Sequence, residues 1–123
     1  MIKKILIISN ILIILILLVI GSTNNFIKAN NLEYYNEKEK LMIDSAENYF
    51  SFYYNYLPKE INKKTRVLVS ALVLEKYMDN IKDINGKDCD TSKSYVEVEK
   101  TGSDKYLYKA HLVCDDYETK DGE

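Results

Sequence analysis

Apolar residues fill the first part of the chain almost without interruption, in a run from Ile5 to Ile20 that only Ser9 and Asn10 break. The run holds sixteen residues. That is more than most signal-peptide cores contain and fewer than the roughly eighteen of a membrane span. Lys3 and Lys4 stand directly before it. By the positive-inside rule, this arrangement predicts a cytoplasmic N-terminus and export of the rest of the chain.

The run fits both a retained signal-anchor and a cleaved signal peptide. A cut after Ala29 would place Ile27 at the minus-three position and secrete the domain. We favour the anchor because Ile, Leu and Val fill the run so completely. The expected location is then the cytoplasmic membrane, with a single span and an extracytoplasmic C-terminal domain. The expected membrane-anchor residues are Ile5, Ile8, Leu12, Leu15 and Leu18.

Composition changes after Ile20. Residues 21–31 are rich in Gly, Ser, Thr and Asn, which favour turns over helix interiors, so we expect a short linker. Residues 32–119 suffice for one small domain. The predicted order is a leader at 1–20, a linker at 21–31, an exported domain at 32–119 and an acidic tail at 120–123.

A helical repeat runs from Leu32 to Tyr56 without Gly or Pro. At about 100 degrees per residue, apolar residues fall on one face and charged residues on the other, as in an amphipathic helix. Pro58 disfavours helical geometry in Leu57 and lacks an N–H, so we expect the helix to stop near Leu57. The predicted core face consists of Tyr35, Met42, Ile43, Ala46, Tyr49, Phe50, Tyr53, Tyr56 and Leu57.

A second, narrower apolar ridge lies beside this face and consists of Tyr34, Leu41 and Phe52. It either widens the core-facing stripe or stays exposed and contacts another molecule. We take it as the candidate partner surface, for a protein partner or for self-association at the cell surface.

The next apolar segment, Arg66 to Val69, is short and rich in β-branched residues, which favours a strand. Ser70 is a candidate N-cap for a short helix through Met78. A continuous helix from Lys64 to Asp83 is the competing interpretation.

Alternating apolar and polar residues predict a β-hairpin from residues 94–100 and 105–114, with a turn in TGSD. Cross-strand partners share a face. Pairing Val96 and Val98 with even-numbered core residues therefore requires a loop of three or five residues, such as Gly102 to Asp104. The predicted pairs are Val98 with Tyr108, Val96 with Ala110 and Glu97 with Lys109.

Charge narrows the range of partners. The chain has 17 Lys and Arg against 19 Asp and Glu. Without Lys3, Lys4 and Lys28, the remaining 14 basic residues face 19 acidic ones, a net charge of −5. Nucleic-acid binding needs Lys and Arg to neutralise phosphates, so we expect no nucleic-acid partner. Membrane contact is expected only through the N-terminal helix, and no cofactor or small-molecule substrate is indicated.

Cys89 and Cys114 are the only cysteines, and after an export signal they predict a structural disulfide. His111 lies three residues before Cys114, but strand alternation directs it to the other face. A metal site or a Cys–His nucleophile pair is therefore not expected.

The segment from Asp83 to Ser94 is a loop by composition, with a turn signal at Asn85 and Gly86. It loosely resembles a calcium loop, but the twelve-residue spacing and the terminal bidentate Glu are missing. The oxygen donors in this resemblance are Asp83, Asn85, Asp88 and Asp90.

Neighbouring carboxylates, such as Asp115 with Asp116 or Glu97 with Glu99, are what an acid–base hydrolase would use. Nothing in the sequence shields them or sets their pKa values apart, so a solvated surface is expected. We therefore name no catalytic residue and no metal ligand.

Five segments carry a resemblance: LP at residues 57–58, SAL at 70–72 followed by Tyr77 and Met78, IKDINGKDCD at 81–90, SYVEVEKTG at 94–102 and KYLYKAHLVCDDY at 105–117. From Pro58 through Thr119 the chain resembles a small exported domain of Gram-positive surface proteins with type IV pilin-like or pseudopilin-like architecture. The prepilin processing motif is absent near Gly21.

The resemblance implies an α+β fold: an N-terminal apolar helix, then a long amphipathic helix packed on a small antiparallel sheet with a disulfide-tied C-terminal hairpin. The expected function is a membrane-anchored extracytoplasmic assembly or protein-interaction module without catalysis. A free-standing binding module, anchored or secreted, is the alternative, and a small hydrolase is a third hypothesis.

Overall fold

The computed structural model describes residues 31–120. The chain divides into two units, Met1–Glu33 and Tyr34–Glu123, and the second unit contains the sheet and the disulfide. Residues 1–30 and 121–123, which include the leader and most of the predicted linker, lie outside the described residues. So do the predicted anchor residues Ile5, Ile8, Leu12, Leu15 and Leu18. Within residues 31–120, no helix combines the length and the apolar composition needed to cross a membrane.

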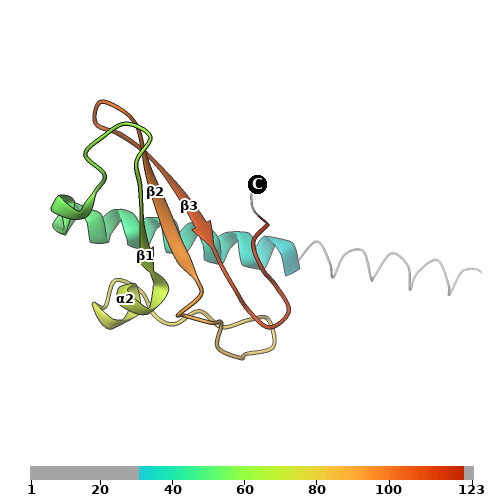
Figure 1. Ribbon diagram of the computed structural model, residues 1–123. Helices are drawn as coiled ribbons and strands as arrows, with labels where there is room; N and C mark the ends of the chain where they lie inside the picture. Colours follow the sequence, from blue (N-terminus) through green and yellow to red (C-terminus); the bar gives the residue numbers. More distant parts are fainter. Residues whose placement is uncertain (1–30, 121–123) are drawn as a thin grey trace, which may run out of the picture. The chain divides into compact units, whose positions relative to one another are not determined.

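A long helix covers residues 31–52 of the described chain (Figure 1). As predicted it is amphipathic, because buried side chains recur at helical spacing while Glu37, Asp44 and Glu47 are exposed. Asn31, which the sequence analysis assigned to the linker, is already helical. The buried apolar residues of the helix are Tyr35, Met42, Ala46 and Phe50.

The long helix ends at residue 52, earlier than the predicted end near Leu57. A 3-10 turn, η1 at Tyr54–Tyr56, follows it, and Leu57 is extended with φ −66° and ψ 148°. Pro58 explains both features. Its ring would clash with the carbonyl of Tyr54 in a continuing α-helix, and it has no N–H to bond that carbonyl. The Leu57 N–H donates to the Tyr54 carbonyl instead, at 3.2 Å.

Three antiparallel strands form one sheet in the order β1 (Lys64–Leu68), β2 (Tyr95–Gly102) and β3 (Lys105–His111). The long helix lies against one face of this sheet (Figure 1). The result is a two-layer α+β arrangement, as predicted. The sheet residues that join the core are Val67, Val96 and Val98, which are buried, and Tyr106, Tyr108 and Ala110, which are partly buried.

The hairpin register is confirmed pair by pair: Val96 lies opposite Ala110, Glu97 opposite Lys109 and Val98 opposite Tyr108. The predicted loop is wrong. Gly102 pairs with Lys105, which leaves a turn of two residues, and the register shifts between Lys100 and Gly102. A bulge at residue 101 therefore absorbs the extra residue that the prediction had placed in the loop.

The strand-and-helix interpretation of the middle segment is confirmed, with different boundaries. Helix α2 covers Val69–Leu74, so it ends before Met78. The predicted N-cap is wrong. Leu68 occupies that position without a side-chain hydrogen bond, and Ser70 lies inside the helix, where its N–H donates to the Thr91 carbonyl. Lys76 then takes a left-handed conformation, with φ 64°, and reverses the chain.

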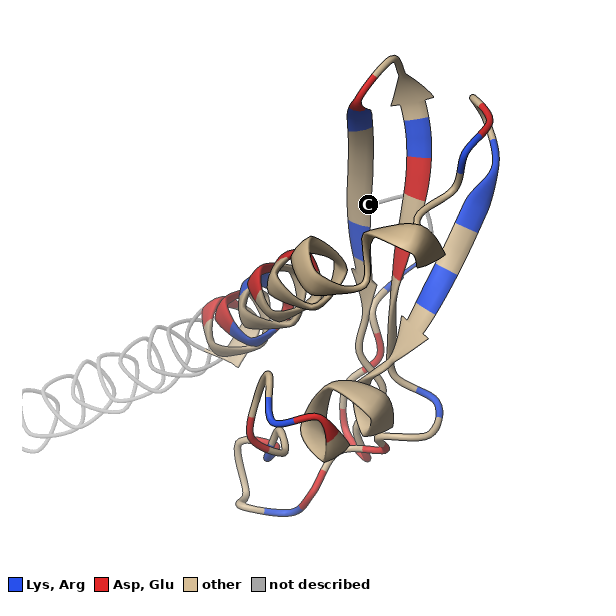
Figure 2. Cartoon of the chain, turned by 90° about the vertical axis from the view of Figure 1, so that its left-hand side faces the viewer, with Lys and Arg blue, Asp and Glu red and all other residues tan. Residues whose placement is uncertain are grey.

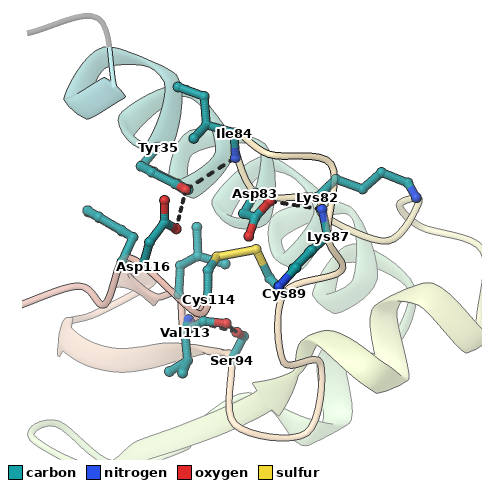
Figure 3. Close-up of a disulfide and its surroundings, with 12 residues drawn as sticks. Tyr35, Lys82, Asp83, Ile84, Lys87, Cys89, Ser94, Val113, Cys114 and Asp116 are labelled. Atoms are coloured by element: carbon teal, nitrogen blue, oxygen red, sulfur yellow. Dashed lines mark hydrogen bonds between the residues drawn. A yellow bond between two sulfur atoms is a disulfide. The ribbon is translucent and has the colours of Figure 1, made fainter. Parts of the chain in front are cut away.

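The predicted disulfide between Cys89 and Cys114 is present and joins the loop after α2 to the end of the hairpin (Figure 3). Beyond it the chain turns back, so that Val113 pairs with Glu118 and the Thr119 N–H donates to the Leu112 carbonyl. We call residues 112–119 the C-terminal strap.

The C-terminal strap is bonded to the first half of the long helix. Tyr35 donates to Asp116, and the hydroxyls of Tyr117 and Thr119 both donate to Glu39. The Tyr35 hydroxyl also accepts the Ile84 N–H, so it links the strap, the helix and the 83–94 loop (Figure 3).

Candidate functional site

The structure separates the members of the predicted partner ridge. Tyr34 is partly buried, and its hydroxyl donates to the Lys82 carbonyl at 2.7 Å, so it holds the loop after α2 against the helix. Leu41 is 43% exposed and Phe52 is 70% exposed. Tyr34 and Phe52 lie about 27 Å apart along the helix at 1.5 Å per residue, and Ser45 between them is buried. The ridge is therefore not one continuous patch.

Phe52 instead belongs to an apolar surface at the end of the long helix. Tyr54 is 67% exposed, Tyr56 is 62% exposed and Leu74, at the end of α2, is 80% exposed. We call the surface formed by Phe52, Tyr53, Tyr54 and Tyr56 the aromatic end. Leu74 directly precedes Glu75, which is bonded to Tyr53.

Sequence reasoning placed Tyr56 in the core, and that prediction is wrong. The helical repeat stops at residue 52, so the positions after it no longer follow the 100-degree spacing. The sequence contained a signal for this early end of the helix. Pro58 forbids an α-helical bond to the carbonyl four residues earlier, which places the last regular turn before Tyr54. The sequence contains no charged residue from 48 to 58, and Figure 2 shows uncharged ribbon from the end of the helix through η1.

Ring contacts hold the aromatic end together. The ring of Tyr53 lies 4.8 Å from Phe52, 5.6 Å from Tyr56 and 4.7 Å from Tyr49, measured between centroids. Tyr49 in turn meets Tyr77 edge-to-face at 5.5 Å. Such pairs contribute about 0.5–1.5 kcal/mol each beyond their buried area, so the rings form an ordered platform.

Glu75 is the carboxylate of this region. It caps α2, and its Oε2 accepts a hydrogen bond from the Tyr53 hydroxyl at 3.3 Å. Desolvation and the neighbouring Glu75 carboxylate raise the pKa of Tyr53. Burial, with smaller effects from Tyr56 and Glu75, raises the pKa of Tyr49. Both phenols therefore stay neutral hydrogen-bond donors at physiological pH.

The carboxylates of the 83–94 loop are engaged in its own turns. Asp83 is buried, and one oxygen accepts the N–H groups of Asn85 and Lys87 at 2.9 and 2.8 Å. Asp90 accepts from Ser92, and Asp88 lies 3.5 Å from the Lys82 ammonium. In the described part of the chain, no three His, Cys, Asp or Glu side chains gather closely enough to hold a metal ion.

His111 lies on the sheet face opposite the helix, as strand alternation predicted. Its Nε2 is 3.2 Å from Glu118, and its ring stacks on Tyr95 at 4.9 Å. The Arg66 guanidinium lies 4.1 Å from the centre of the same Tyr95 ring. These contacts form a polar stack across three strands and account for His111 without a chemical role.

The carboxylates considered for acid–base work are also engaged. Asp116 accepts from Tyr35 at 2.7 Å, and Glu97 lies 3.0 Å from Arg66. Of the ten large apolar side chains that are exposed in residues 31–120, the aromatic end contains three within five residues, those of Phe52, Tyr54 and Tyr56. Comparisons of the chain with protein-family models, with curated proteins and with solved structures found no match.

Proposed function

We propose that the chain is an exported interaction module that binds another protein through the aromatic end and performs no catalysis. The apolar run at Ile5 to Ile20 serves as its anchor in the cytoplasmic membrane, with the described domain outside. A disulfide, which persists in oxidising compartments, is consistent with that location.

One observation carries the proposal: Phe52, Tyr54 and Tyr56, which follow one another within five residues, are each at least 62% exposed although all are large and aromatic. Burying such a side chain contributes roughly 1.5–3 kcal/mol, so a partner that covers the surface gains a substantial free energy of binding. Tyr and Phe are also enriched at the centres of protein interfaces.

The resemblance to pilin-like and pseudopilin-like domains suggests that the partner belongs to a surface assembly. A long helix packed on a small antiparallel sheet with a disulfide near the C-terminus supports this proposal. A solitary binding module, anchored or secreted, would use the same surface.

Crosslinking in cells tests the proposal. A photoreactive amino acid at position 54 of the full chain should give a discrete crosslinked product, and Phe52→Asp should abolish it by placing a charge in the interface. Leu107→Asp is the matched control, because Leu107 is 44% exposed on β3, at the face opposite the helix. Circular dichroism checks that both variants fold. A folded Phe52→Asp variant with undiminished crosslinking would overturn the proposal.

A further inference from the structure

Three tyrosine rings outside the aromatic end each lie beside a Lys or Arg side chain of the same chain. Lys38 lies 5.1 Å from the ring centre of Tyr34, Arg66 lies 4.1 Å from that of Tyr95 and Lys100 lies 6.0 Å from that of Tyr106. These separations are within the roughly 6 Å at which a cation is attracted to the negative face of an aromatic ring.

In residues 31–120, the rings at and around the aromatic end have no such cation beside them. Among the described residues, no Lys or Arg lies over Tyr49, Tyr53, Tyr56 or Tyr77 at that distance. The charged group bonded to these rings is instead the Glu75 carboxylate, through Tyr53. Within residues 31–120, Glu75 forms no ion pair, although Lys76 follows it directly.

The faces of the aromatic rings and the Glu75 carboxylate both attract positive charge. An aromatic face carries a negative quadrupole potential, and Glu75 adds a full negative charge beside it. The part of the chain after Ala29 has 14 basic and 19 acidic residues, so its overall field also attracts cations. The site therefore complements a positive group with a flat apolar surface.

We propose that the aromatic end binds an arginine side chain of a partner protein, with the exposed ring of Tyr56, which is backed by Tyr53, as the stacking platform and Glu75 as the counter-charge. Arginine fits better than lysine, because its planar guanidinium stacks on a ring and still donates in-plane hydrogen bonds to a carboxylate. This inference rests on the proposed function and names the chemistry of the partner.

Two probe peptides test whether the positive charge of arginine contributes to binding. One is an acetylated, amidated peptide with two arginines separated by glycine, and the other replaces both arginines with citrulline, which has nearly the same shape without the charge. Each is titrated into the full chain in neutral detergent, with carbon-labelled tyrosine, and ring signals are followed by NMR. The arginine peptide should bind about threefold to tenfold more tightly and shift the signals of Tyr53 and Tyr56.

Variants separate ring stacking from hydrophobic contact. Tyr56→Phe should keep the preference for arginine, because the ring remains. Tyr56→Leu should reduce it about threefold although the side chain stays apolar. Glu75→Gln should also weaken binding of the arginine peptide, while the signal of Tyr108 in the core reports an intact fold. Equal affinity for both peptides, no binding of either, or binding indifferent to Glu75→Gln would overturn the inference.

The experiments can refute the inference about arginine without refuting the proposed function. If Phe52→Asp abolishes crosslinking in cells but the peptides bind equally, the surface is an interface and its partner does not present arginine. If crosslinking is unchanged in a folded Phe52→Asp variant, the proposed function fails whatever the peptides do.

Discussion

Tyr35 donates a 2.7 Å hydrogen bond to Asp116, a residue 81 positions later in the chain. The ring of Tyr35 also stacks on Tyr117, with the centroids 4.2 Å apart. The start of the domain is thereby fastened to its end, and Tyr35 is 3% exposed.

Tyr35→Phe should lower the free energy of unfolding by about 1–3 kcal/mol, measured by urea denaturation at neutral pH. The ring and its stacking remain, so the loss comes from the bond to Asp116 and from the Ile84 N–H, which loses its acceptor. Tyr54→Phe is the control, because Tyr54 is 67% exposed and its stability should not change measurably. An unaffected Tyr35→Phe variant would show that the strap is held without this hydroxyl.

Alkaline pH should weaken the contribution of the Tyr35 hydroxyl to the free energy of unfolding. Burial, then the hydrogen bond to Asp116, raises the pKa of Tyr35 from 10.0 to about 12. The folded state therefore holds a proton that the unfolded state releases first, and the stability from this group is present below pH 10 and lost between about pH 10 and 12. Across this window the wild type should lose more stability than Tyr35→Phe. Parallel losses in the two proteins would contradict the assignment.

Removing the disulfide should be costly for so small a domain. Cys89 and Cys114 are 25 residues apart, and closing such a loop contributes about 3.5 kcal/mol in the chain-entropy model. Replacing both cysteines by serine should lower the melting temperature by about 15 °C or more, measured by calorimetry. Free thiols in the native protein, detected by alkylation, would refute the pairing.

Two leucines, Leu107 within β3 and Leu112 directly after it, test the assignment of faces. Leu112 is fully buried and Leu107 is 44% exposed. Leu112→Ala should cost about 2–5 kcal/mol through lost burial and a cavity, whereas Leu107→Ala should cost less than about 1 kcal/mol. Similar costs in denaturant titrations would mean that the outer face is also covered.

Leu41→Asp shows how far the partner surface extends along the helix. Leu41 is 43% exposed, so the variant should fold with little change in melting temperature. Phe52 lies eleven residues further on, about 16 Å along the axis. If the partner covers the aromatic end alone, crosslinking at position 54 should survive Leu41→Asp. Loss of crosslinking in a folded Leu41→Asp variant would show that the proposed partner surface extends along the helix as far as Leu41.

Periodicity predicted the strand pairing and the helix face because one face of each element is buried, which fixes which residues point inward. Val96, Val98 and Met42 follow that rule. The two-residue turn at Ser103 and Asp104 was not predicted, because the bulge at residue 101 takes up one residue close to the turn, beyond the apolar pairs that set the register.

The candidate site was harder to predict, because it depends on where a helix stops. Phe52 was identified, whereas Tyr56 was placed in the core and Leu74 was not singled out. The exposure of Tyr56 follows from a local backbone event, the 3-10 turn before Pro58, which hydrophobic periodicity does not register. The contact between Tyr53 and Glu75 joins elements 22 residues apart, and no local pattern encodes it.

The C-terminal strap also sets when the domain can fold. Glu39 receives the hydroxyls of Tyr117 and Thr119, which lie 78 and 80 positions later, so these bonds to the first half of the helix form only after the strap has been made. On the proposed export route, residues 112–119 cross the membrane after the helix to which they bond. Until the strap and the second cysteine emerge on the oxidising side, the segment already outside would lack both these bonds and the disulfide.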